Sequence, residues 1–347
     1  MHCRSSQASQ MAAHRFGVTM IELVTTIGII ALLLALITSA VQSARESARR
    51  LQCQNNLHQL LVATQSHHTT HGSLPSLYNG TSLKYPLREW DLFHMHSWRV
   101  ELLPFMEQQV FKDQLHWDKL ATAEENLPIA RTRIPSLICP SGGDPNDLGE
   151  GLKHEFFPMP ADGITPDKMY SVARSDYDAM AAIQNPPDPL PTGENVNAFK
   201  YAHWGIWGWP VFDRPQIVGM VLRGYRAGKF RDVTDGLSNT IAIVERNGKP
   251  IHYKDGKPHP TPENPEAVYP GQVGWSASNT FAWSVNGPGI GVNQDNAAGI
   301  YSFHSGGANV SLADGSVHFL SDATDFETLV KLYARSDGGI PEEFLGQ

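Results

Sequence analysis

An apolar run near the N-terminus constrains this chain more than any other feature. Between residues 18 and 41, 17 of 24 positions are Ala, Val, Ile, Leu or Met, and no charge occurs from Leu23 to Ala44. A helix of 24 residues is about 36 Å long, which exceeds the roughly 30 Å of a bilayer's hydrocarbon core. The run contains no proline, so we predict a membrane-spanning helix. Glu22 lies inside the run, where a carboxylate is unfavourable unless it is paired.

The residues before the run have the character of an export signal. Residues 1–17 contain Arg4 and Arg15 and no acidic residue, which is typical of a basic leader. Three arginines also follow the run closely, so the positive charges do not decide its orientation. Orientation therefore has to come from the leader itself.

The order of Gly17, a short segment ending at Glu22 and then the apolar run resembles the type IV prepilin signal. The resemblance implies that a prepilin peptidase/N-methyltransferase cuts between Gly17 and Val18 and methylates the new amine, although Val18 stands where the family usually has phenylalanine. It also implies that Glu22 pairs with the N-terminal ammonium of a neighbouring pilin-like subunit. The alternative is a glutamate tolerated near the wet end of the helix. A start at Met11 would shorten the 17-residue leader to seven residues.

The predicted helix continues beyond the membrane to about residue 70. Gly72 and Pro75 supply the stop signal. Small and apolar residues recur near a 3.6-residue period, so this half should pack one face against the rest of the protein. The stripe consists of Ala44, Ala48, Leu51, Leu57, Leu60, Leu61 and Thr64.

The remainder of the chain has the pattern of one turn-rich domain. Five Asp-Gly pairs mark tight turns between short β-type runs. The strands are expected at residues 240–244, 300–303, 309–312 and 317–320. Helices are expected at residues 100–115 and 324–333, the second with Asp322 as its cap.

Composition excludes several functional classes. The chain has 27 Lys and Arg against 35 Asp and Glu, a net charge of −8, which disfavours nucleic acid as a partner. Three cysteines do not make a zinc quartet. Neither Gly-x-Ser-x-Gly nor His-Glu-x-x-His nor a phosphate-binding glycine loop occurs, so we expect no enzyme activity, no catalytic residue, no resident metal and no cofactor.

A second motif lies in the C-terminal third. Nine residues separate His304 from Asp314 and Gly315, and this segment resembles the H-X9-DG motif of the DUF1559 family of pilin-like proteins. Other segments agree with the family in order along nearly the whole chain. They include Asn55-Asn56-Leu57, His71-Gly72-Ser73-Leu74-Pro75, Leu137-Ile138-Cys139-Pro140-Ser141, Ser175-Asp176-Tyr177 and Asp235-Gly236-Leu237-Ser238-Asn239-Thr240.

The alternation around this motif predicts a three-stranded meander. A strand should run to His304, a second strand to Leu312, and a third should follow a hairpin turn at Asp314 and Gly315. In the structural interpretation Gly315 takes positive φ, Asp314 accepts from turn amides and His304 makes a polar contact between strands. The alternative makes His304 and Asp314 metal ligands or a catalytic pair.

Two cysteines remain after removal of the leader. In an oxidising compartment Cys53 and Cys139 invite a disulfide that would join the long helix to the domain. The alternative is two buried thiols that behave as small apolar groups.

Two further clusters leave a choice between packing and binding. His67 and His71 share a helix face and would suit either a metal or a capping role. The aromatic run of Trp204, Trp207, Trp209 and Phe212 would suit either a sugar- or partner-binding surface or a loop folded onto the core.

The two resemblances together imply a type IV pilin-like α+β protein of the bacterial inner membrane. We expect a leader at 1–17, a long helix at 18–72 with its membrane part at about 18–41, and a loop-rich antiparallel β-sheet domain at 73–347 on the periplasmic side. The H-X9-DG segment spans about 299–320. The expected partners are the prepilin peptidase, other pilin-like subunits and the lipid bilayer, in a pilus or a type II secretion pseudopilus. Alternatives are a membrane-tethered module that binds carbohydrate or protein, and a hydrolase on a pilin anchor.

Overall fold

Helix α1, Met20–His71, is the longest element of the protein. Its 52 residues correspond to about 78 Å. Among the residues that the structure describes, α1 alone is long and apolar enough to cross a membrane. From Met20 to Ile37 its large apolar side chains are 50–84 % exposed. The helix ends close to the predicted residue 70. Gly72 terminates it, because this residue takes a φ of +74° and its N–H donates to the carbonyl of His68 at 2.8 Å.

The coordinates are a computed structural model. It describes residues 19–79, 95–121, 123–143, 148–150, 171–184, 205–212, 222–249, 251–259, 274–277, 281–286, 291–296 and 299–335. Gly17 and Val18 lie outside this set. By its internal contacts the chain divides into Met1–Ser47 and Ala48–Gln347. The second unit therefore includes the last turns of α1 as well as the predicted globular domain at 73–347.

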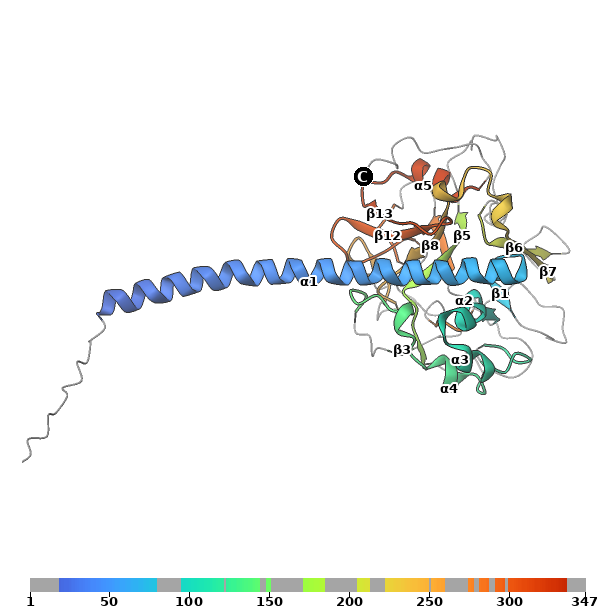
Figure 1. Cartoon of the computed structure of the whole chain (residues 1–347), viewed down its shortest axis with the longest axis horizontal. Coiled ribbons are helices and arrows are strands. Elements are labelled where there is room, and N and C mark those ends of the chain that lie inside the picture. Colours follow the sequence, from blue (N-terminus) through green and yellow to red (C-terminus); the bar gives the residue numbers. More distant parts are fainter. Residues whose placement is uncertain are drawn as a thin grey trace, which may run out of the picture. The chain divides into compact units, whose positions relative to one another are not determined.

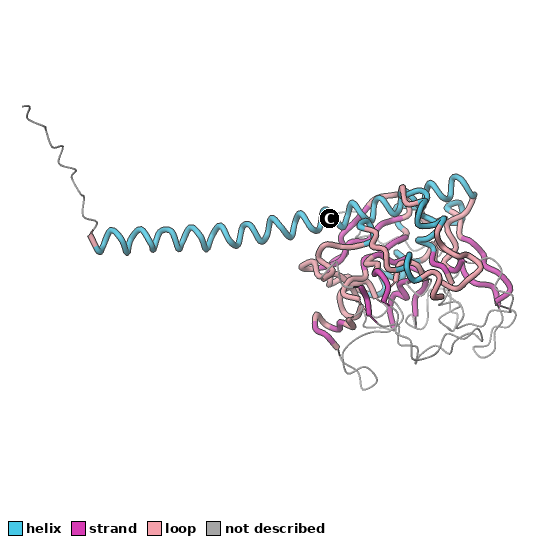
Figure 2. Tube along the Cα trace, turned by 90° about the horizontal axis from the view of Figure 1, so that it is seen from below, coloured by secondary structure: helices cyan, strands magenta, loops and turns pink. Residues whose placement is uncertain are grey.

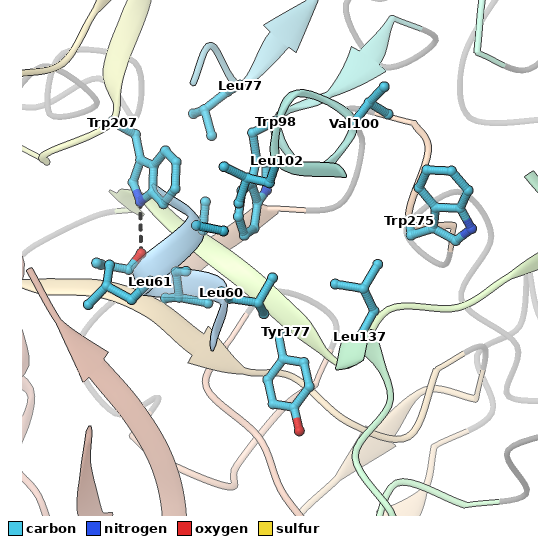
Figure 3. Close-up of a cluster of buried hydrophobic side chains, with 14 of the residues drawn as sticks. Leu60, Leu61, Leu77, Trp98, Val100, Leu102, Leu137, Tyr177, Trp207 and Trp275 are labelled. Atoms are coloured by element: carbon cyan, nitrogen blue, oxygen red, sulfur yellow. Dashed lines mark hydrogen bonds between the residues drawn. The ribbon is translucent and has the colours of Figure 1, made fainter. Parts of the chain in front are cut away.

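These last turns of α1 are built into the core. Figure 2 shows them along one side of the second unit. The buried positions follow a helical period, as predicted, but the stripe begins later than predicted, because Leu51 is 60 % exposed. Its buried members are Cys53, Asn56, Leu57, Leu60, Leu61, Ala63, Thr64 and His67. Leu60 and Leu61 contact a core that contains Trp98, Trp207 and Tyr177 (Figure 3).

A five-stranded sheet forms the centre of this unit (Figure 1). The strand order is β11-β5-β8-β12-β13, and every neighbouring pair is antiparallel except β11 with β5. The strands are β5 (Tyr177–Gln184), β8 (Ile241–Glu245), β11 (Phe281–Asn286), β12 (Gly307–Leu312) and β13 (Val317–Ser321). Helix and antiparallel sheet occupy separate parts of the chain, so the predicted α+β class is confirmed.

The two sides of β12 face different surroundings. Ala308, Val310 and Leu312 join a cluster of apolar side chains that includes Leu329 and Tyr333 of α5, Phe326–Tyr333. Asn309 and Ser311 alternate with them, and Asn309 accepts a 3.1 Å hydrogen bond from Gln54 of α1. Since successive side chains of a strand point to opposite faces, β12 separates the α1 side from the α5 side.

The predicted meander is half correct. β12 and β13 form the expected hairpin around Asp314 and Gly315. The third strand is not the segment before His304, which makes only a single bridge from Tyr301 to Arg246. β8 takes that place, pairing antiparallel with β12. Periodicity in the sequence identifies strands, but it does not show whether a strand pairs with its neighbour in the sequence or with a strand far away in the sequence.

The predicted helix at 100–115 is broken. Pro104 and a left-handed Glu107 (φ 60°) interrupt it. The C-terminal helix is present, but Asp325 rather than Asp322 caps it, by accepting from the N–H of Thr328 at 2.8 Å. The short helices are α2 (Trp98–Leu102), η2 (Leu103–Met106), α3 (Gln109–Asp113), α4 (Leu127–Ala130), η3 (Pro135–Leu137), η7 (Phe230–Asp232) and η8 (Leu237–Asn239).

The remaining strands of the described residues form four two-stranded sheets. Each pairs antiparallel. They are β1 (Tyr78–Asn79) with β2 (His96–Ser97), β3 (Leu148–Glu150) with β4 (Ser171–Ala173), β6 (Gly208–Phe212) with β7 (Leu222–Ala227), and β9 (Tyr253–Lys254) with β10 (Lys257–Pro258).

Replacing Leu57 should unfold the compact unit far more readily than replacing Leu51. Leu57→Ala leaves a cavity in the core and should lower the free energy of unfolding by about 2–5 kcal/mol. Leu51→Ala makes the same chemical change at an exposed position of the same helix, and its effect should stay within about 0.5 kcal/mol. Urea unfolding of the full chain in detergent, followed by tryptophan fluorescence, measures both; equal effects would contradict the burial of this half of α1.

Candidate functional site

Segments from the whole compact unit meet around Cys139. Cys139 is bonded to Cys53 of α1 in a disulfide, with a Cα–Cα distance of 5.3 Å across a sequence separation of 86. Asn56, one turn further along α1, donates to the carbonyl of Ile138 at 3.0 Å and to the Tyr177 hydroxyl at 3.2 Å. Two residues of α1 thus hold the Cys139 loop, one covalently and one by hydrogen bonds.

Asp176 holds the same loop from the sheet side. Its Oδ2 accepts from the N–H of Cys139 at 2.9 Å, and Arg174 Nε lies 3.3 Å from the same oxygen. The N–H of Asp176 donates to Leu137, and its carbonyl accepts from Arg246, both at 2.9 Å. Burial raises the pKa of Asp176 above its ordinary value, although Arg174 and the Cys139 N–H act in the opposite direction.

Asp178 is the centre of a buried ionic cluster. Lys249 Nζ lies 2.9 Å and Arg246 Nε 2.5 Å from its Oδ2, and Arg99 of α2 contacts Oδ1. Burial by itself would raise the pKa of Asp178, but Arg246, Lys249 and Arg99 together outweigh it and hold this pKa well below its usual value. Cations from two chain segments, α2 and the residues after β8, therefore surround this carboxylate.

For the pKa of Lys249, burial outweighs the effect of the neighbouring opposite charge. Burial and the neighbouring Arg246 lower the pKa of its amine, while Asp178 partly compensates. Charges placed in a protein interior have to be paired closely, because the interior cannot solvate them as water does. The cluster therefore locks α2, β5 and the segment after β8 together.

His304 lies at the disulfide. Its Nε2 is 3.6 Å from Oε1 of Glu245 and 3.8 Å from Sγ of Cys139. Glu245, at the end of β8, is fixed by Asn309, whose N–H donates to Oε2 at 2.8 Å and whose amide donates to Oε1 at 3.1 Å. The histidine of the H-X9-DG motif therefore belongs to the buried contacts around Cys139.

Asp314 and Gly315 lie at the other end of β12. The six residues of that strand span about 20 Å, so His304 and Asp314 do not form a pair. Gly315 takes a φ of +107°, and Asp314 accepts from the N–H and hydroxyl of Ser316 at 2.9 and 2.7 Å. His58 of α1 contacts the Gly315 carbonyl at 3.0 Å. In the structure this turn joins the β12–β13 hairpin to α1.

These contacts involve most of the family segments found in the sequence. A sequence model of the family described as protein of unknown function (DUF1559) matches residues 42–327. This chain belongs to the DUF1559 family. The matched range begins before the buried stripe of α1 and ends within α5, so it covers nearly all of the compact unit. No curated protein and no solved structure matches the chain at a significant level.

The histidine pair on α1 of this DUF1559 protein makes packing and capping contacts. The rings of His67 and His71 stack at 4.2 Å, and His67 Nε2 lies 3.3 Å from Glu101. His67 Nδ1 contacts the carbonyl of Ser73 at 3.0 Å, beyond the helix end. Both ring nitrogens of His67 thus have protein partners, which favours packing over a metal pair.

The aromatic run is divided between core and undescribed positions. Trp207 is buried against Trp98, with the two ring centroids 4.8 Å apart, and its Nε1 donates to the Ala242 carbonyl at 2.7 Å (Figure 3). Trp204 lies outside the described residues, and only the backbone is described at Trp209 and Phe212. At Trp207 the core interpretation is correct.

The N-terminal end of α1 contains a capping box. Glu22 Oε2 accepts from both the N–H and the hydroxyl of Thr19 at 2.8 Å, and the N–H of Glu22 donates to the Thr19 hydroxyl at 3.3 Å. This Thr-x-x-Glu arrangement satisfies N–H groups that the first helical turn leaves unpaired. Glu22 therefore has a local structural role in addition to the one implied by the prepilin signal.

Sequence reasoning missed the residues that hold the site together. Glu245, Arg246 and Asp178 belong to no motif that we recognised. A signal was present, since Glu245 and Arg246 directly follow the apolar strand residues Ile241–Val244 and Asp178 follows a segment of the family pattern. Charges adjoining a buried strand require partners, but the sequence alone does not identify them.

Removing the charge of Asp178 should destabilise the fold strongly. Asp178→Asn leaves three buried cations without their shared carboxylate, so we expect a loss of about 3–5 kcal/mol in the free energy of unfolding. Asp232→Asn is the matched control, because Asp232 pairs with Arg231 at a partly exposed position, and its effect should stay within about 0.5 kcal/mol. Urea unfolding of the full chain provides the comparison.

The difference between wild type and Asp178→Asn should also depend on pH. The folded-state pKa of Asp178 lies below its usual 3.8, so its contribution to stability is present above that pH and is lost as pH falls below it. The contribution of the Asp178 carboxylate to the gap between the two chains should therefore shrink below about pH 4. A gap that does not change down to about pH 3 would contradict an ionised, stabilising Asp178.

Proposed function

We propose that this DUF1559 protein is a pilin- or pseudopilin-like structural protein with a single membrane pass. The prepilin peptidase would cut it after Gly17, α1 would anchor it in the inner membrane, and the compact unit would lie on the periplasmic side. Assembly with other pilin-like subunits would take place through α1. This proposal depends mainly on one observation: the apolar side chains of α1 are exposed in the first half of the helix and buried along one stripe in the second half.

The first half of α1 is apolar on all of its faces. Its large apolar side chains are exposed from Met20 to Ile37. A helix that is apolar all round needs apolar surroundings on every side, which lipid or neighbouring helices supply. The second half is buried along one stripe only, as expected for a helix packed on a water-soluble domain.

The disulfide supports a periplasmic location of the compact unit. Bonds such as Cys53–Cys139 form and persist in oxidising compartments and are rare in the cytosol. A periplasmic location of the compact unit agrees with this bond. It also agrees with the prepilin signal, in which the leader stays on the cytoplasmic side.

Processing should leave Val18 as the first residue. We expect the chain purified from membranes to begin with an N-methylated Val18, because Gly17 and Glu22 occupy the signal positions. Mass spectrometry of the N-terminal peptide measures this. An intact leader, or a cut near residue 40 as in an ordinary signal peptide, would contradict the proposal.

Glu22 variants separate the two roles of this carboxylate. Glutamine retains a capping-box side chain but removes the charge, whereas alanine removes both. If Glu22 pairs with a neighbour's ammonium, Glu22→Gln and Glu22→Ala should both lower the assembled fraction by about tenfold or more, because an unpaired ion then remains at the interface. Crosslinking in membranes followed by sizing measures assembly.

Glu46→Gln is the control for this experiment. It removes a carboxylate from the same helix outside the predicted membrane part and should leave assembly unchanged. If Glu22→Gln assembles normally and only Glu22→Ala fails, Glu22 acts as a helix cap alone. If no variant and no wild type assembles, the tethered binding module becomes the better candidate function.

A further inference from the structure

Four potential metal ligands meet inside the compact unit. They are Cys53 of α1, Cys139 of the loop after η3, Glu245 at the end of β8 and His304 just before β12. All four side chains are buried, and their ligand atoms lie within 4.8 Å of one another. Two sulfurs, one imidazole nitrogen and one carboxylate oxygen form a donor set that suits zinc.

Two of the distances in this cluster match a tetrahedral site, and a third is close to one. Zinc binds sulfur at about 2.3 Å and nitrogen or oxygen at about 2.0–2.2 Å, so the ligand atoms of a tetrahedron lie about 3.3–3.8 Å apart. His304 Nε2 is 3.6 Å from Glu245 Oε1 and 3.8 Å from Cys139 Sγ. Cys139 Sγ is 4.0 Å from Glu245 Oε1. The two sulfurs, joined in the disulfide, are closer than a tetrahedron allows.

We propose that the reduced form of this protein binds one Zn²⁺ ion through Cys53, Cys139, Glu245 and His304. A dithiol or phosphine reductant gives two electrons to the disulfide and is itself oxidised, which leaves two thiols. Zn²⁺ then displaces the two thiol protons to solvent and binds both thiolates, the imidazole and the carboxylate. The disulfide and the ion are alternative links between the same elements.

The groups behind the ligands hold them in position. Asn309 donates two hydrogen bonds to Glu245 and itself accepts one from Gln54 of α1. The N–H of His304 donates to the hydroxyl of Ser302 at 3.1 Å. Such outer partners orient metal ligands and raise affinity. The Cα atoms of Cys53 and Cys139 lie 5.3 Å apart, so both thiolates stay close to the site once the disulfide is reduced.

In this site His304 is a metal ligand, a role that differs from the polar contact between strands expected from the sequence. The H-X9-DG segment would place one ligand at the start of β12 and anchor the far end of the same strand on α1. Before the disulfide forms, the ion would hold the last turns of α1 against the sheet. The inference rests on the compact unit alone and does not require that the protein assembles into filaments.

Cobalt titration of the full chain tests the site. The chain in detergent is reduced with a phosphine, transferred to oxygen-free buffer and titrated with Co²⁺, whose absorption reports thiolate ligands and tetrahedral geometry. We expect one Co²⁺ per reduced chain, displacement by Zn²⁺, and no binding by the oxidised chain. Protection of both thiols from alkylation by Zn²⁺, read by mass spectrometry, is the second measurement.

Variants distinguish this site from binding by two free thiols. His304→Gln and Glu245→Gln keep both cysteines, and each should weaken Co²⁺ binding by more than about 100-fold, since outer partners alone contribute about 10–100-fold. His116→Gln changes an exposed histidine of the same unit that has no part in the site and should have no effect. Absorption that persists unchanged in His304→Gln would overturn the proposal. So would a reduced wild-type chain that takes up no metal or that unfolds and is not restored by Zn²⁺.

Discussion

The compact unit depends on the burial of α1 between Cys53 and His67. One stripe of this helix supplies Leu57, Leu60 and Leu61 to the core and also carries the disulfide and the Asn56 hydrogen bonds. Apolar burial provides free energy without direction, whereas the covalent bond and the hydrogen bonds fix the position of the helix along its axis. The sheet, the Cys139 loop and the β12–β13 hairpin all meet this one surface.

The buried charges impose a second constraint on the same unit. Asp178 is stable as an anion only while Arg99, Arg246 and Lys249 surround it, and these come from two separate segments, α2 and the residues after β8. Asp176 and Glu245 neighbour that cluster and reach the Cys139 loop and His304. Because removing one partner of a buried ion pair is strongly unfavourable, the segments have to assemble together.

The same stretch of α1 makes further contacts with the compact unit. The Cys53–Cys139 bond, the Arg50 contact over the ring of Phe319 at 3.4 Å and the His58 contact with Gly315 tie the helix to the loop and the hairpin. A subunit held by α1 in an assembly would need such attachments, and they lie where α1 joins the compact unit.

Local patterns in the sequence were enough to predict the long helix, its end at Gly72, the strand before Glu245 and the β12–β13 hairpin. Each depends on periodicity or turn residues within a few positions. The cysteine count left a disulfide and two free thiols open, and the structure contains the disulfide. Strand order, the break at Pro104 and the partners of Asp178 and His304 were not predictable. They depend on which distant segments bury their charges together, and only the tertiary structure brings those segments into contact.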